Sequence, residues 1–324
     1  MSLTTQRRNS RYEEPLPRLP FLDRESVANV QGLASLPTVR LECLWWTPYA
    51  MCKDQAVKPS SALARRGILA TLAAVLLCVS PEAFLGTSEP TAAEVLAAAD
   101  RVRNPGQPFR VTLALVEYNN GKPRDRVGLV VYAKEDQQTK QFNNLVRYIE
   151  PRRDAGKMVL LKGANLWFYD PASKASIRIS PQQRLIGQAS EGDVLSVNLA
   201  RDYTSRIASE ESMQDADRRE RDCWHLDMTA ATPDAIYSHI EYWVEKGSYQ
   251  PIKGKFYSDS GRLLKVAYYH KYEELLGALR PAQVVLIDAV NANLATTIDY
   301  ADYRAQDIPD PWFQRDYLPR LRPE

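Results

Sequence analysis

The sequence predicts a mainly β protein with few helices, built on one strongly curved or barrel-like antiparallel sheet. Strand-like runs recur about every eight to twelve residues from Phe109 onward, short turn sequences separate them, and long helices do not alternate with them. The chain of 324 residues, with 44% hydrophobic and 25% charged residues, has the composition of an ordinary globular protein. Collagen, coiled coil and general disorder are therefore excluded.

The charge balance gives no reason to expect a nucleic-acid partner. Lys and Arg number 42 and Asp and Glu number 40, so the formal net charge is +2. Proteins that bind phosphate backbones carry a concentrated basic patch. The basic pair Arg152–Arg153 is too short to form one.

An uncharged apolar run, GILATLAAVLLCV at 67–79, divides the chain. As a helix it would rise only about 20 Å, whereas a bilayer core is roughly 30 Å thick. Lys58, Arg65 and Arg66 precede the run, and a polar stretch begins at Thr87. This order of basic, apolar and polar segments is typical of a secretory signal peptide.

Three segments follow from this pattern. Initiation at Met51 would give a leader of normal proportions, so we expect residues 51–86 to be a signal peptide that directs export to the periplasm. An uncleaved membrane anchor is the less favoured alternative. Residues 1–50 are then a mis-assigned start or a disordered segment, and residues 87–324 are the working domain.

The cysteines give no disulfide framework for that domain. Cys43, Cys52 and Cys78 precede it, and only Cys223 lies within it. The alternation in DCWHLDM predicts a strand that places Cys223 and His225 on one face. We expect a buried structural thiol here, with a catalytic Cys–His pair as the weaker alternative.

The working domain opens with an Ala-rich helix at 90–102 and continues almost entirely as strands. An Asn-Gly pair at Asn120–Gly121 predicts the first hairpin. The strand-like stretches are 108–134, 140–150, 156–163, 165–171, 175–180, 202–211, 222–230, 235–246, 251–261, 262–274, 283–290 and 293–303.

Two segments lack a strand pattern. Residues 181–193 have neither a helical nor a strand period and are expected to form a helical turn or loop, with a lid as the functional alternative. Residues 310–319 are expected to form a helical turn that packs on the sheet through Trp312 and Phe313.

No sequence motif points to an enzyme, a metal site or a cofactor. Nucleophile-elbow, zinc-protease, phosphate-loop and dinucleotide motifs do not occur in residues 87–324. The histidines, His225, His239 and His270, fall in three different strands, so a metal site would require them to converge in space. We therefore expect no catalytic residues, no metal and no cofactor.

Apolar residues occupy both faces of several strands. In the first strand, Phe109, Val111 and Leu113 alternate with Ala114 and Val116. A sheet with one face in water alternates more cleanly, so either both faces are covered or one face encloses a hydrophobic cavity. A plain sandwich core and a ligand-holding half-barrel both fit this pattern.

Several segments together resemble the LolA-like family of periplasmic outer-membrane lipoprotein-sorting proteins, in particular longer relatives found beside transporters of the resistance-nodulation-division type. The similarity covers residues 90–317 and is carried by the opening helix, a Glu-Pro strand end, a Trp-x-Tyr-x-Pro element and a Trp-Val hairpin, here 94–106, Glu150–Pro151, Trp167–Pro171 and Trp243–Ile252. At 185–193 the chain departs from the Phe-containing, Gly-rich loop of these relatives.

The resemblance implies an open half-barrel, closed by helices, that shields acyl chains from water without a cofactor. The implied partners are lipids or lipoprotein acyl chains and an inner-membrane transporter, and the implied role is carrier or chaperone in delivery to the outer membrane. A lipid-sensing regulatory module of the cell envelope is the alternative. Taking one apolar face per strand, we expect these residues to line the cavity: Phe109, Val111, Leu113, Leu129, Val131, Leu160, Trp167, Leu185, Ile186, Trp224, Leu226, Tyr242, Val284 and Leu286.

Overall fold

The computed structural model describes residues 89–321. The expected signal peptide at 51–86 and the segment 1–50 lie outside the described residues. Between residues 89 and 321, no helix has the length and apolar character needed to cross a membrane.

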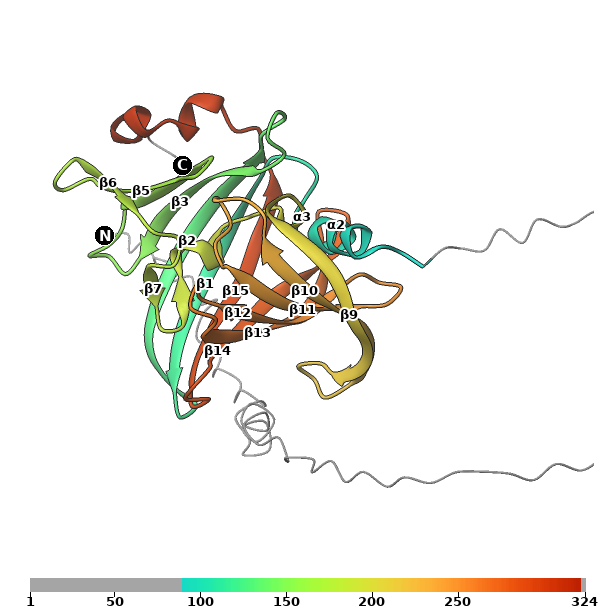
Figure 1. Cartoon of the computed structure of the whole chain (residues 1–324). Helices are drawn as coiled ribbons and strands as arrows, with labels where there is room; N and C mark the ends of the chain where they lie inside the picture. The colour runs from blue at the N-terminus through green and yellow to red at the C-terminus, as the bar shows by residue number, and fades with distance from the viewer. Residues whose placement is uncertain (1–88, 322–324) are drawn as a thin grey trace, which may run out of the picture. The chain divides into compact units, whose positions relative to one another are not determined.

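Thirteen strands form one antiparallel sheet in the order β6-β5-β4-β3-β2-β1-β15-β14-β13-β12-β11-β10-β9 (Figure 1). Their bounds are β1 Phe109–Asn119, β2 Lys122–Glu135, β3 Phe142–Glu150, β4 Met158–Lys162, β5 Asn165–Asp170, β6 Ala175–Ile179, β9 Tyr203–Gln214, β10 Glu220–Ala230, β11 His239–Glu245, β12 Pro251–Tyr257, β13 Leu263–Leu275, β14 Ala278–Asp288 and β15 Leu294–Ala305.

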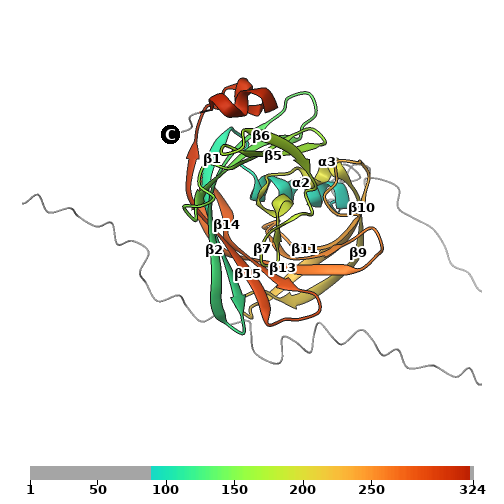
Figure 2. The same cartoon turned by 90° about the vertical axis from the view of Figure 1, so that its left-hand side faces the viewer.

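Two meanders make up this sheet, and they join where β1 pairs with β15. The free edges are β6 and β9, which do not pair with each other, so the sheet curves into an open half-barrel (Figure 2). The predicted fold class, a mainly β protein with a curved antiparallel sheet, is confirmed.

The first hairpin follows from its turn residues. Asn120 and Gly121 have φ values of 51° and 72°, and Asn119 pairs with Lys122 across them. A two-residue turn with both φ values positive matches the twist of antiparallel strands, and Asn-Gly is the preferred pair for it.

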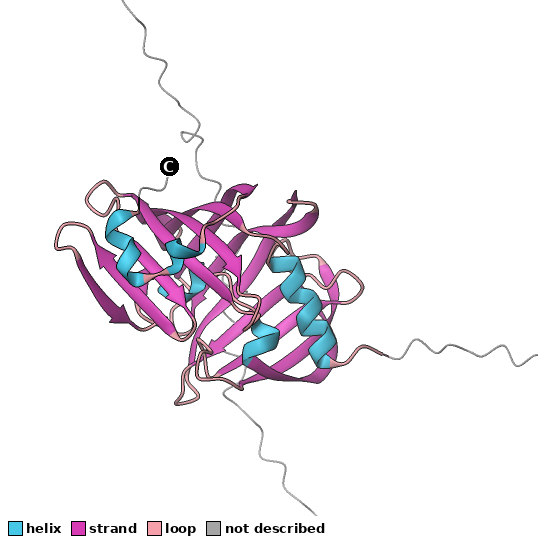
Figure 3. Ribbon diagram, turned by 90° about the horizontal axis from the view of Figure 1, so that it is seen from above, coloured by secondary structure: helices cyan, strands magenta, loops and turns pink. Residues whose placement is uncertain are grey.

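Helix α2 (Ala92–Arg103) begins at a capping box in which Thr91 and Glu94 each bond the other's backbone N–H. Its buried stripe, Val95, Leu96 and Ala99, faces the concave side of the sheet. Figure 3 shows the helix lying across the strands. The predicted opening helix is thus confirmed.

Residues 181–202, the cover segment, also lie inside the curve of the sheet (Figure 2). They form a small hairpin, β7 (Arg184–Ile186) with β8 (Ala189–Ser190), then the 3-10 turn η1 (Glu191–Val194) and the short helix α3 (Leu199–Asp202). The sequence pattern predicts only a helical turn or loop at 181–193. It misses the hairpin because the two strands are two or three residues long, too short for a period to be read.

The C-terminal segment covers part of the opposite, convex face. After β15, the 3-10 turns η2 (Asp310–Phe313) and η3 (Arg315–Arg320) pack against the outer side of β2 to β5. Phe313 is 1% exposed, and Trp312 meets Tyr132 edge-on at 5.3 Å between ring centroids. The predicted packing of this tail on the sheet through Trp312 and Phe313 is confirmed.

Candidate functional site

The concave face of the sheet, α2 and the cover segment enclose one continuous apolar core, which we call the chamber. Eleven of the expected lining residues lie in it, and Leu185 packs at its margin. The eleven are Phe109, Val111, Leu113, Leu129, Val131, Ile186, Trp224, Leu226, Tyr242, Val284 and Leu286.

Leu160 and Trp167 do not line the chamber, and the expectation for these two residues is corrected. They lie on the convex face, where they pack with the C-terminal segment, and Arg315 lies 5.0 Å from the centre of a Trp167 ring. Their neighbours Leu161 and Leu166 point into the chamber instead. Because both faces of β4 and β5 are covered, apolar alternation could not tell inside from outside.

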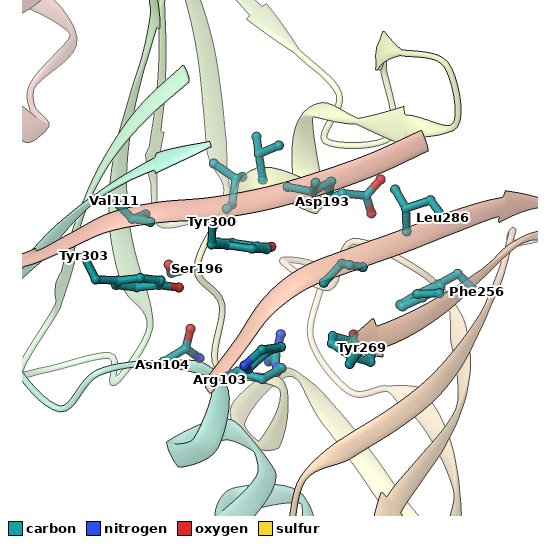
Figure 4. A pocket seen from close by; sticks show the side chains of 16 residues that line it. Arg103, Asn104, Val111, Asp193, Ser196, Phe256, Tyr269, Leu286, Tyr300 and Tyr303 are labelled. Atoms are coloured by element: carbon teal, nitrogen blue, oxygen red, sulfur yellow. The ribbon is translucent and has the colours of Figure 1, made fainter. Parts of the chain in front are cut away.

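Besides a more open pocket of about 360 Å³ at the β7–β8 hairpin, two small cavities lie between the cover segment and the sheet. One, of about 90 Å³, is lined by Arg103, Ser196, Tyr300 and Tyr303 together with apolar strand residues (Figure 4). The other, of about 70 Å³, shares Arg103, Asp193 and Leu195 with the first. Pockets that hold small molecules usually measure roughly 300–1,000 Å³. The side chains of the cover segment thus leave little free space around Arg103.

Asp193 anchors the cover segment to the sheet from within. Its carboxylate pairs with the ammonium group of Lys265 on β13. It also accepts hydrogen bonds from the Tyr237 hydroxyl at 2.7 Å and from the backbone N–H of Ser190 at 2.7 Å. Charges buried in an apolar interior must be paired in this way, so Asp193 and Lys265 depend on each other.

A second set of contacts ties the cover segment to β3 and its preceding turn. Asn144 exchanges two 2.9 Å hydrogen bonds with the backbone of Ser196, as a neighbouring strand would. Gln141 accepts from the N–H of Asn198 at 2.7 Å and donates to Asp202 at 2.7 Å. Side-chain amides therefore replace backbone pairing along this border.

Glu191 is the least well satisfied polar residue of the cover segment. One carboxylate oxygen accepts a 2.8 Å hydrogen bond from the Tyr148 hydroxyl, whereas the other is buried without a partner among the described residues. Burial raises the pKa of Glu191 to about 7. The cover segment therefore contains a group whose charge changes near neutral pH.

The tip of the β7–β8 hairpin requires glycine. Gly187 has φ +53°, and a Cβ at this position would lie 2.2 Å from the Thr296 side-chain oxygen on β15. The next residue, Gln188, donates its N–H to that same oxygen at 2.8 Å. The absence of a side chain thus allows the hairpin to dock against the sheet.

Helix α2 contributes a charged residue that the sequence analysis missed. Arg103 pairs with Asp100 and donates to the carbonyl oxygen of Val197 at 3.1 Å, and Asn104 donates to that oxygen at 2.9 Å. An arginine at the end of a helix is usually exposed to water, so its residue type alone does not predict that it lies in a buried site. The available signal is its spacing: Leu96, Ala99 and Arg103 share one helical face.

The three histidines of the domain contact different residues, and its cysteine is free and buried. His225 stacks on Trp243 at 4.2 Å, His239 bonds Asp227 at 2.5 Å, and His270 lies 3.5 Å from Asp217. Burial raises the pKa of the Cys223 thiol to about 12. Within residues 89–321, no group of three or more His, Cys, Asp and Glu side chains is placed to hold a metal ion.

The fold and the site define a half-barrel protein with a covered apolar concave face. The chain belongs to the LolA superfamily. A solved LolA superfamily protein from Nitrosomonas europaea is 32% identical, with a TM-score of 0.63, and the match covers 70% of this chain and 99% of that one. A family model described only as "uncharacterized protein" matches residues 140–320.

Two more distant structures share the fold. A DUF1329 family protein from Desulfovibrio piger is 20% identical, with a TM-score of 0.59, over 70% of this chain and 97% of its own. A protein domain from Vibrio parahaemolyticus, described as a candidate for outer membrane lipoprotein sorting, is 18% identical, with a TM-score of 0.59. The match covers 71% of this chain and 98% of that domain. No functionally curated protein matches the sequence.

Proposed function

We propose that the protein is a periplasmic carrier that holds the acyl chains of a lipid or lipoprotein in the chamber for delivery to the outer membrane. The observation that carries this proposal is the apolar concave face, which is covered by a segment that no strand of the sheet pairs with. Membership of the LolA superfamily supports it, as does the description of the Vibrio domain.

The energetics favour such a container. Leaving an acyl chain in water costs about 0.8 kcal/mol per methylene group, so a lipid that crosses an aqueous compartment needs an apolar enclosure. Val194, Leu195 and Ile186 of the cover segment are buried in the chamber, in the space that we propose for the acyl chain. Their burial keeps the empty protein stable in water, and a bound chain would replace them.

The cover segment is suited to leave and return. Besides its buried apolar side chains, it is attached by discrete polar contacts, chiefly Asp193 with Lys265 and Asn144 with Ser196, rather than by a continuous β ladder. We infer that loading lifts residues 181–202 from the concave face and that handover returns them. In this role the protein needs no catalytic residue, metal or cofactor. An inner-membrane transporter is the partner we propose as the source of the cargo.

The test uses the protein as a cell would export it. The full chain is produced in a bacterial host, recovered from the periplasmic fraction and extracted, and bound lipid is measured by mass spectrometry. Two variants of adjacent residues on β14 form a matched pair. Val284 lines the chamber, whereas Val285 is buried in the core of the convex face.

Val284→Phe is expected to reduce the bound lipid several-fold, whereas Val285→Phe leaves the lipid per folded protein unchanged. Both variants overpack a buried position and should lose a similar amount of stability, roughly 1–3 kcal/mol. Absence of acyl lipid from the wild-type protein would contradict the carrier proposal. Recovery of a membrane protein partner without lipid would instead support a regulatory module.

A further inference from the structure

The cavity of about 90 Å³ beside Arg103 has a polar end that a purely apolar cargo would not use. Arg103 lines both small cavities. Its Nη2 atom donates hydrogen bonds to the Asp100 carboxylate and to the Val197 carbonyl oxygen. Its Nε–H is buried and has no hydrogen-bond partner among the described residues. A buried donor without an acceptor costs free energy, which a ligand acceptor would recover.

Two tyrosines of β15 face the same space. Tyr300 and Tyr303 line the cavity with their rings stacked, 6.3 Å apart and inclined by 17°. Figure 4 shows their hydroxyl ends directed into the cavity on the side of Arg103 and Asn104. Residues three apart on a regular strand point to opposite faces, so their common direction needs a specific cause.

That cause is a bulge in β15. The register between β1 and β15 shifts between Arg110 and Thr112, and Asp302, on the opposing stretch of β15, has φ 53°. A bulge adds one residue to a strand and re-aims the side chains that follow it. Here it turns Tyr303 inward beside Tyr300, where its ring also packs on Phe109 with 5.8 Å between the ring centroids.

The unpaired hydrogen-bond donor at this cavity, together with the charge of the guanidinium that carries it, favours an acceptor, and most strongly a charged one, as the head of the ligand. Asp193, the carboxylate that lines both cavities, is already paired with Lys265. Asp100 lines neither cavity; it pairs with Nη2 of Arg103 and accepts a hydrogen bond from the N–H of Ala200 at 2.7 Å. The unsatisfied group that faces the cavity is therefore a cationic donor, and tyrosine hydroxyls add neutral donors around it.

The opposite wall of this cavity is apolar. Val111, Val284, Leu286 and Ile298 form it on the central strands. A ligand that satisfies both ends must be an amphiphile with a small anionic head and a hydrocarbon tail. A carboxylate is small enough for a space of about 90 Å³, and one of its oxygens can accept the free Nε–H of Arg103.

We propose that the cavity at Arg103, Tyr300 and Tyr303 binds the carboxylate of a long-chain carboxylic acid, with the tail along the apolar wall. This inference rests on the proposed acyl-carrier function and names the cargo class within it. Arg103 and the two tyrosine hydroxyls donate to the carboxylate oxygens. The hydrocarbon tail takes the place of Leu195 and its neighbours in the cover segment.

The test compares laurate with its methyl ester, which has the same tail and no charge. Binding is measured by titration calorimetry with lipid-stripped protein. Because a hydrogen bond to a charged group contributes more than a neutral one, laurate is expected to bind about ten-fold more tightly or better than methyl laurate. Dodecyl phosphate provides a second anionic head of different shape.

The variant Tyr300→Phe/Tyr303→Phe removes the two hydroxyls and keeps the rings. It is expected to weaken laurate binding by about ten-fold and to change methyl laurate binding by less than about two-fold. The control, Tyr132→Phe/Tyr268→Phe, makes the same change on the convex face and should leave both affinities unchanged.

The possible results separate the two proposals. Equal binding of laurate and methyl laurate, or an unchanged preference in the Tyr300/Tyr303 variant, would overturn the carboxylate site and leave the acyl carrier standing. Tighter binding of dodecyl phosphate than of laurate would also overturn the carboxylate assignment. Binding of none of the three ligands would reject the carrier function itself, and the carboxylate site with it.

Discussion

The ammonium group of Lys265 on β13 and the carboxylate of Asp193 in the cover segment form an ion pair inside the chamber, with side chains only 6% and 8% exposed. The pair joins a segment outside the sheet to the concave face of the sheet. Ser190 and Tyr237 supply further donors to the same carboxylate. The position of the cover segment therefore depends in part on two opposite charges that are almost entirely buried.

Removing one partner of this pair should be costly. Lys265→Met is expected to lower the free energy of unfolding by about 3–5 kcal/mol, because it leaves the Asp193 charge buried and unpaired. Urea unfolding measures the loss. Lys246→Met, which breaks a surface pair with Glu210, is the control and should cost less than about 1 kcal/mol. Equal losses in the two variants would show that Asp193 is not held as described.

Gly187→Ala should release the β7–β8 hairpin. The added Cβ would meet the Thr296 oxygen at 2.2 Å, and the backbone at this position has positive φ. We expect faster amide hydrogen exchange across residues 184–190. Gly277→Ala is the matched control, since Gly277 also has positive φ, +76°, but has no atom within 4 Å of the new Cβ. Only backbone strain of about 1–2 kcal/mol should appear there.

Glu191 should make stability fall as the pH rises towards neutrality. Its pKa is about 7 in the folded protein, against the ordinary 4.5, so the folded state holds the proton more tightly than the unfolded state does. The stabilisation is complete below pH 4.5 and is lost as the pH rises to about 7. It amounts to about 3 kcal/mol.

The Glu191→Gln variant isolates this effect. The wild-type free energy of unfolding, measured in urea across the acidic and neutral range, should decline relative to that of the variant as the pH rises. The Tyr148 hydroxyl can still donate to the side-chain carbonyl that the substitution introduces. A difference between the two proteins that does not change with pH would contradict the raised pKa.

Leu160 tests the assignment of faces. Leu160→Ala should cost about 2–5 kcal/mol, because the residue is buried under the C-terminal segment. It should expose residues 308–321 to proteolysis without changing ligand affinity. Leu113→Ala, a loss of equal size on the concave face, should change ligand affinity. If the Leu160 variant alone changed ligand affinity, the result would contradict the position of Leu160 on the convex face.

The local elements of this fold could be predicted from the sequence because each has a local cause. The Asn120–Gly121 turn, the Thr91 capping box and the alternation of Phe109, Val111 and Leu113 act over a few residues. The open sheet, in contrast, depends on the pairing of β1 with β15, whose partners Asn119 and Leu294 are far apart in the chain. No pattern within either strand specifies that pairing.

The missed parts of the site have non-local causes as well. Strand alternation separates Leu160 from Leu161 but cannot say which of them faces inward, and the answer depends on the C-terminal segment that covers Leu160. The inward turn of Tyr303 depends on a bulge at Asp302, where the sequence has no glycine to mark it. Arg103 becomes part of the site only because the cover segment encloses it.

The position of the cover segment in the chain has a mechanical consequence. Residues 181–202 connect β6 to β9, and these two strands are the free edges of the sheet. The segment is therefore a strap that spans the opening of the half-barrel, fixed at one end to each rim. Any cargo that moves β6 and β9 apart must also pull on this strap. The distance between the two edge strands and the contacts of the strap with the concave face therefore change together.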